Sequence, residues 1–241
     1  MAAPPRRNAK SIPREERLIV AVDVPGYEEA LALVDQLGES VRFYKLGLEL
    51  AMSGRYFDLV EELKGRGKRI FADLKFFDIP VTVAAAVREL SKRGVDFATV
   101  HGNESMIEAA CAEKGSLALL AVTVLTSIDE RDFRDLGVEV SIESLVLSRA
   151  RRVVALGCDG VISSGVEARA LREAVGDGFL IVAPGIRPLE SADDQRRVVT
   201  PREAFDNGAD YIVVGRPIRA SADPRAAAES VQATIRECFS A

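Results

Sequence analysis

Residues 69–75 read Arg-Ile-Phe-Ala-Asp-Leu-Lys, an apolar run that ends in two ionisable side chains. Successive side chains of a β-strand point to opposite faces, so Phe71, Asp73 and Lys75 share one face. That face is apolar where the strand begins and charged where it ends. Such a strand is typical of a closed α/β barrel, in which catalytic groups come from the C-terminal ends of the strands and the lower layers are packed core.

Three other predicted strands also have an inward face that begins with apolar side chains and ends with polar or ionisable ones. Their inward faces are Ile19, Ala21 and Asp23; Phe43 and Lys45; and Phe97, Thr99 and His101. The outward face of the first run, expected to meet the helices, is Leu18, Val20, Val22 and Val24. Taken singly, such ionisable residues have ordinary roles as helix caps, solvated lysines or structural ion pairs. Their convergence at four strand ends predicts an active site, with a supporting hydrogen-bonding role for His101.

Short apolar runs alternate with amphipathic helical segments as far as the C-terminus, which predicts parallel strands wound by helices. Eight such runs in 241 residues predict an α/β fold, a single-domain (β/α)8 TIM barrel over residues 15–241, with residues 1–14 as a flexible N-terminal tail. Thr200 to Glu203 predicts a helix N-terminus with a capping box, and Asp223-Pro224 predicts another. The expected strands are Leu18–Val24, Val41–Leu46, Arg69–Lys75, Phe97–His101, Leu117–Leu125, Gly160–Ser163, Phe179–Ala183 and Tyr211–Val214.

The composition of the chain limits which ligands, metal sites and cellular compartment are expected. A net charge of -5 gives no overall attraction to nucleic acid or anionic lipid, and no apolar run approaches the roughly 20 residues that cross a bilayer. The three scattered cysteines predict neither a disulfide framework nor a thiolate metal site, and a reducing cytoplasm fits them best. A single histidine argues against a multi-histidine zinc site. Composition leaves open a Mg²⁺ site built from Asp23 and Asp73, although the interleaved lysines oppose it.

Two glycine-rich loops predict a phosphate site. Residues 183–188 (Ala-Pro-Gly-Ile-Arg-Pro) follow the seventh run, and residues 213–217 (Val-Val-Gly-Arg-Pro) end the eighth. Barrels often bind phosphate at these two loops, where glycines let backbone N–H groups approach and a guanidinium adds paired donors. Either loop alone is equally compatible with a simple turn and a surface arginine. The polar residues 191–197 between them could serve as a closing lid.

The stretch from Asp73 to Pro80 (Asp-Leu-Lys-Phe-Phe-Asp-Ile-Pro), with Thr82 after it, closely resembles the signature of the orotidine 5'-monophosphate decarboxylase family. The resemblance extends from Leu18 onward, and together its segments are highly specific. In family order they are residues 21–23, 44–47, 100–102, 124–127, 184–188, 193–195 and 214–217. The family signature usually has His in place of Phe77 and Asn in place of Val81.

The resemblance implies cofactor-free conversion of orotidine 5'-monophosphate to uridine 5'-monophosphate and CO2, without a metal. In that reading Lys75 stabilises and protonates the carbanion, Asp73 faces the departing carboxylate, and Lys45 and Asp78 complete an alternating chain of charges. The implied substrate contacts are Asp23 and Lys45 to the ribose, Asp73 to the departing carboxylate, Thr126 to the pyrimidine, and Arg187, Gln195, Gly215 and Arg216 to the phosphate, with Thr82 as a substrate contact in the neighbouring subunit's site. A homodimer is also implied, in which Asp78 and Thr82 serve the neighbouring site.

Three alternatives accompany this reading. A related barrel acting on a sugar phosphate through a metal-stabilised enediolate has a similar Asp-x-Lys-x-x-Asp pattern, but the Leu-Thr-Ser and Asp-Asp-Gln segments argue against it. A Schiff-base aldolase lacks its lysine, since the sixth run ends Val-Ile-Ser-Ser-Gly. A phospho-ligand binding barrel without activity would not require Asp73 and Lys75.

Overall fold

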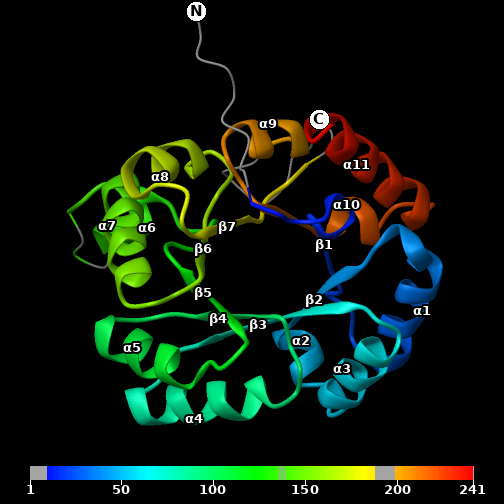
Figure 1. Cartoon of the computed structure of the whole chain (residues 1–241), viewed down its shortest axis with the longest axis horizontal. Helices are drawn as coiled ribbons and strands as arrows, with labels where there is room; N and C mark the ends of the chain where they lie inside the picture. The colour runs from blue at the N-terminus through cyan, green and yellow to red at the C-terminus, as the bar shows by residue number, and fades with distance from the viewer. Residues whose placement is uncertain (1–9, 136, 138, 188–198, 241) are drawn as a thin grey trace, which may run out of the picture.

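Eight parallel strands close into one barrel in chain order (Figure 1). The computed structural model describes residues 10–135, 137, 139–187 and 199–240. Each strand pairs with the next, and β8 returns to β1 through the pair Leu18 and Ile212. The predicted (β/α)8 barrel is therefore confirmed. Its strands are β1 (Leu18–Ala21), β2 (Phe43–Gly47), β3 (Arg69–Phe76), β4 (Phe97–Val100), β5 (Ala118–Val122), β6 (Gly160–Ile162), β7 (Leu180–Ala183) and β8 (Tyr211–Val214).

The predicted strands all occur, and β8 matches its prediction at both ends. The largest difference is in β5, which ends at Val122 although the apolar run continues to Leu125. Val124 is buried beside the helices without belonging to the ladder. Hydrophobicity therefore overestimates strand length where the chain turns over the rim of the barrel but stays buried.

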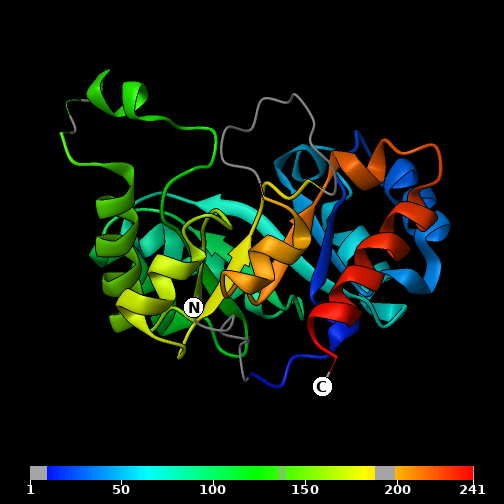
Figure 2. The same ribbon diagram turned by 90° about the horizontal axis from the view of Figure 1, so that it is seen from above.

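The helices form a ring around the barrel (Figures 1 and 2). They are α1 (Tyr27–Leu37), α2 (Leu48–Ala51), α3 (Tyr56–Gly65), α4 (Pro80–Ser91), α5 (Glu104–Glu113), α6 (Glu130–Asp135), α7 (Ile142–Ala155), α8 (Ala168–Val175), α9 (Pro201–Asp206), α10 (Arg216–Arg219) and α11 (Pro224–Cys238), with short 3-10 turns at Arg14–Glu16 and Gly38–Ser40. The capping box at Thr200 and Glu203 is present, and the side chain of Asp223 caps α11. Across the described residues, every helix is too short or too polar to span a bilayer.

Two hydrophobic clusters hold the barrel. One fills its interior and includes the rings of Phe43 and Phe97, whose centroids are 4.9 Å apart, with Phe97 also 5.1 Å from Tyr211. The other lies between strands and helices and includes Leu18 and Val20. The predicted alternation is confirmed for the apolar side chains, because those expected to point inward belong to the first cluster and those expected to point outward belong to the second. The aromatic layer forms the floor beneath the charged rim.

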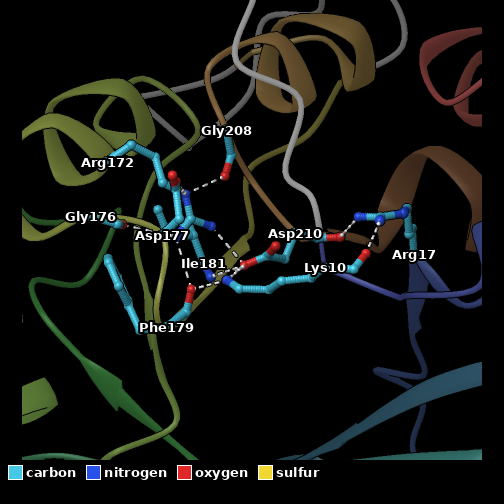
Figure 3. A network of polar contacts seen from close by, with 9 residues as sticks. All are labelled: Lys10, Arg17, Arg172, Gly176, Asp177, Phe179, Ile181, Gly208 and Asp210. Carbon is cyan, nitrogen blue, oxygen red and sulfur yellow. Dashed lines mark hydrogen bonds and ion pairs between the residues drawn. The ribbon is translucent and has the colours of Figure 1, made fainter.

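A buried ion network closes the opposite end of the barrel (Figure 3). Asp210, which immediately precedes β8 and is fully buried, accepts hydrogen bonds from Arg172 Nη2 at 2.7 Å, Lys10 Nζ at 2.9 Å and Ile181 N at 2.8 Å. Arg17 Nη1 donates to the backbone oxygen of Asp210 at 3.0 Å. These bonds join α8, β7 and β8 to the start of the described chain.

This network corrects the predicted N-terminal boundary. Residues 10–14 were expected to belong to a flexible tail, but Lys10 is paired with Asp210 and Ile12 packs against the inner cluster. The prediction is wrong for these residues because the partner of Lys10 lies 200 positions away, where no local pattern reveals it. Residues 1–9 of the expected tail lie outside the described residues.

We expect Asp210→Ala to lower the free energy of unfolding by about 3–5 kcal/mol, because it leaves the Arg172 guanidinium buried without its carboxylate. Urea unfolding followed by circular dichroism measures this change. Glu237→Ala is the matched control, since Glu237 pairs with Arg202 at 2.5 Å on the exposed surface and such pairs contribute little. Equal unfolding midpoints for the two variants would contradict the structural importance of the network.

Candidate active site

A cavity of about 300 Å³ opens at the C-terminal ends of the strands, within the size range of small-molecule sites. Its apolar floor includes Ala21 and Phe71 from the barrel interior. Its other lining residues are Asp23, Lys45, Asp73, Lys75, Val122, Val124, Leu125, Thr126, Ile162, Pro184, Gly185, Arg187, Val213, Gly215, Arg216 and Arg219. Basic side chains lie at one end and an alternating charged array at the other, so the cavity suits an elongated anionic ligand.

The charged array joins the ends of β1, β2 and β3. Lys45 Nζ lies 2.9 Å from Asp23 Oδ1 and 3.6 Å from Asp73 Oδ2, and Lys75 Nζ lies 2.8 Å from Asp73 Oδ1. The Asp73 side chain is only 13% exposed, whereas that of Lys75 is 32% exposed. One buried carboxylate therefore sits between two ammonium groups, and one of these faces the open cavity.

Thr99 fixes this array from β4. It is fully buried, its Oγ1 accepts a hydrogen bond from the backbone N of Lys75 at 2.8 Å, and it donates to Asp73 Oδ1 at 2.9 Å. The register of β3 against β4 shifts between Ala72 and Phe76. The backbone of Lys75 has φ +49°. Among the described residues, Lys75 is the only non-glycine residue with a positive φ. Such backbone strain persists only where the surroundings enforce it, and the Thr99 hydroxyl supplies part of that constraint.

The charge on Asp73 is maintained despite its burial. Desolvation alone would raise the pKa of Asp73, but Lys45, Lys75 and the hydrogen bond from Thr99 outweigh it and hold the pKa below its ordinary value. Asp73 is therefore an anion near neutral pH, and it keeps the ammonium of Lys75 close. Among the described residues, no three His, Cys, Asp or Glu side chains gather as a metal-binding group.

The loops after β7 and β8 form the basic end of the cavity. Gly185 and Arg187 come from the first loop, and Gly215 and Arg216 from the second, as predicted. Sequence reasoning missed Arg219, which also lines the cavity and whose buried Nε has no hydrogen-bond partner among the described residues. Its spacing of three residues from Arg216 is the signal that could have found it, because i and i+3 side chains share a helix face.

Most of the predicted site residues therefore meet in one cavity. Those that line it are Asp23, Lys45, Asp73, Lys75, Thr126, Arg187, Gly215 and Arg216. Asp78 and Thr82 do not line it and are exposed at the rim, before and within the start of α4. Gln195 and the polar segment 191–197 lie outside the described residues.

His101 lies beside the array without lining the cavity. Its ring packs edge-on against Phe77 with centroids 5.5 Å apart, and its backbone N donates to Phe76 O at 2.9 Å. Burial, followed by the positive charges of Arg149 and Lys75, lowers the pKa of His101. The imidazole is therefore held neutral at the edge of the site.

Comparison with known proteins agrees with this geometry. A family model described as "Orotidine 5'-phosphate decarboxylase / HUMPS family" matches residues 16–231. The orotidine 5'-phosphate decarboxylase of Methylococcus capsulatus is 59% identical over 96% of this chain and 97% of its own, and that of Xanthomonas campestris is 54% identical over 92% of each. The crystal structure of orotidine 5'-phosphate decarboxylase from Lactobacillus acidophilus superposes with a TM-score of 0.82 at 37% identity, covering 91% of this chain and 99% of that one.

We expect the His101 imidazole to titrate below the ordinary histidine range. It is the only histidine, so its ring signals in an NMR pH titration are unambiguous. Arg149→Met should raise the pKa of His101, because it removes a cation that disfavours a second positive charge. Arg152 lies on α7 like Arg149 but pairs with Glu104 of α5, so Arg152→Met is the control and should have a smaller effect. An ordinary pKa in the unaltered protein would contradict the described surroundings of His101.

Proposed function

The chain belongs to the orotidine 5'-phosphate decarboxylase / HUMPS family, and we infer that it catalyses the conversion of orotidine 5'-monophosphate to uridine 5'-monophosphate and CO2. This is the final step of uridine 5'-monophosphate biosynthesis. The observation that carries the inference is the Lys45–Asp73–Lys75 array at one end of a cavity whose other end is basic. An inactive phospho-ligand barrel would have no use for a carboxylate buried between two ammonium groups.

The two ends of the cavity suit the two ends of this nucleotide. Gly185, Arg187, Gly215 and Arg216 would receive the phosphate, with Arg219 as a further donor from α10. Asp23 and Lys45, paired at 2.9 Å, would meet the ribose hydroxyls, and Thr126 the pyrimidine edge. Binding energy from the phosphate, remote from the reacting carbon, would then hold the pyrimidine against the charged array.

We propose that Lys75 performs the central step. Loss of CO2 breaks the bond to C6 and leaves its electron pair on that carbon, where the ring does not delocalise it. The Lys75 ammonium, partly exposed to the cavity, would stabilise the developing negative charge and then transfer a proton to C6. The products are CO2, the uridine nucleotide and a neutral lysine, which takes up a proton from solvent before the next turnover.

Asp73 and Thr99 prepare Lys75 for this step. Asp73 would face the substrate carboxylate, and the repulsion between the two anions is relieved when CO2 leaves. Thr99 holds both the backbone of Lys75 and the carboxylate of Asp73, so it acts as a positioning residue. The reaction needs no metal, since the lysines supply the positive charge and repel a cation from Asp23 and Asp73. None of the three cysteines is in a disulfide, which suits a reducing cytoplasm.

We propose that the active form is a homodimer. Phe77, Ile79 and Val81 are 64%, 60% and 71% exposed around Asp78, and they form an apolar rim at the start of α4. The neighbouring α2, which contacts β3, exposes Leu48 as well. A second copy would cover this apolar surface and place Asp78 and Thr82 of each subunit at the neighbour's cavity, reciprocally by two-fold symmetry.

We expect Lys75→Ala to reduce turnover at least about a thousandfold, because it removes both the charge stabilisation and the proton donor. Loss of the orotate absorbance after addition of orotidine 5'-monophosphate measures turnover, with chelator present throughout. Lys92→Ala, which alters an exposed pair with Glu89, is the control and should remain active. No turnover by the unaltered protein would refute the proposed function, and near-normal turnover by Lys75→Ala would refute the role of Lys75. A requirement for Mg²⁺ would favour the sugar-phosphate alternative.

We expect Asp73→Ala and Asp78→Ala to be nearly inactive alone but to complement each other when mixed under subunit exchange. Random mixing makes about half of the dimers heterodimers, and each heterodimer contains one site with both native aspartates. About a quarter of all sites should therefore recover. Mixing each variant with itself is the control. If exchange is verified by differently tagged subunits and activity stays absent, the two aspartates do not serve a shared site.

A further inference from the structure

Two cysteine thiols touch at the end of the barrel opposite the cavity. Cys111 lies in the last turn of α5, and Cys158 lies two residues before β6, with their Sγ atoms 3.7 Å apart. The α5 and α7 helices lie side by side (Figure 1). The turn after α7 carries Cys158, which contacts Cys111 of α5. A strand starts at the end of the barrel away from the catalytic rim, so this pair takes no part in the site described above.

The two thiols differ in access and in acidity. Cys111 is partly exposed, whereas Cys158 is 5% exposed. The hydrogen bond with Cys158 lowers the pKa of Cys111 against the effect of burial, and the nearby Lys114 ammonium acts in the same direction. The same hydrogen bond and burial raise the pKa of Cys158. Cys111 is therefore the more accessible and the more acidic of the two thiols, and Cys158 lies buried behind it.

The backbone around the pair is already held close. Lys114 Nζ bridges the two segments by donating to Gly157 O and to Asp159 Oδ2, each at 2.7 Å. A Cβ added at Gly157 would lie 3.9 Å from Cys111 Cβ, so the turn packs directly on α5. A disulfide requires the sulfur atoms to approach to about 2.05 Å. Contacting sulfurs on adjoining backbones need side-chain rotation and small shifts rather than a rearrangement of the fold.

We propose that Cys111 and Cys158 form a reversible dithiol–disulfide site whose substrate is a low-molecular-weight disulfide such as oxidised glutathione. The Cys111 thiolate attacks one sulfur of that disulfide, whose S–S bond breaks and releases one thiolate, which takes up the proton that Cys111 lost. Cys158 then attacks Cys111 Sγ, its proton passes to the second departing thiolate, and the internal disulfide forms. Two protein thiols are oxidised, and one small disulfide is reduced to two thiols.

The crosslink joins the C-terminal end of α5 to the start of β6. It closes a long loop through β5 and α7, which restricts the unfolded chain and raises thermal stability. Turnover at the distant rim should stay unchanged. In a reducing cytoplasm the pair remains as thiols, and it closes when small disulfides accumulate.

The full-length protein is incubated with oxidised glutathione, without metal or air, and analysed by intact mass and by non-reducing peptide mapping. We expect the loss of two hydrogens, a peptide pair joining Cys111 to Cys158, a higher melting temperature, and full reversal by dithiothreitol. Cys158→Ala should stop at one glutathione bound to Cys111, because the second thiol is missing. Cys111→Ala should remain unmodified, because Cys158 is buried.

Cys238→Ala is the matched control, since Cys238 is 2% exposed on α11 and lies outside the pair. It should behave as the unaltered protein does. A stable glutathione adduct on Cys111 while Cys158 is intact would overturn the proposal, as would a disulfide that includes Cys238 or joins two chains. The mass map of the unaltered protein decides the question even if a variant folds poorly.

Discussion

A single buried carboxylate organises the rim of this barrel. Asp73 loses most of its hydration at the end of β3, and an unpaired charge there would cost several kcal/mol. Lys45 from β2, Lys75 from β3 itself and Thr99 from β4 compensate it, and Lys45 brings Asp23 from β1 into the same chain of contacts. The need to balance one charge thus fixes the relative positions of four consecutive strand ends, on which a site for an anionic nucleotide depends.

The charged side chains at the two ends of the barrel differ in how far they are buried and hydrogen-bonded. At the closed end, Asp210 and Arg172 are 0% and 3% exposed in their side chains, and they bond to each other, to backbone groups and, for Asp210, to Lys10. At the rim, Asp23 and Lys75 keep 45% and 32% of their side chains exposed. The Asp210–Arg172 pair is therefore satisfied within the protein and contributes to stability, whereas the rim retains polar groups that a ligand can engage.

Features that depend on local sequence patterns were predicted from the sequence. The period of two in β1 and β3 identified the inward side chains, and the capping pattern at Thr200 located a helix start. The contacts of Lys10 with Asp210 and of Cys111 with Cys158 depend on tertiary structure and leave no local pattern. The roles of Asp78 and Thr82 came from the resemblance alone, because a single chain places them outside its own cavity.

The backbone conformation of Lys75 also could not be predicted from the period of two, although the position of its side chain on the inward face was. In a regular ladder its N–H would bond to the backbone of β4, but here it bonds to the Thr99 side chain, and pairing resumes only at Phe76 and Val100. The hydroxyl thus replaces a ladder partner and lets the backbone adopt φ +49° without leaving a buried N–H unsatisfied. The same hydroxyl also donates to Asp73. Regular strand geometry is therefore broken at Lys75, the residue whose charge must be positioned, and the Thr99 hydroxyl on β4 compensates for the lost backbone hydrogen bond.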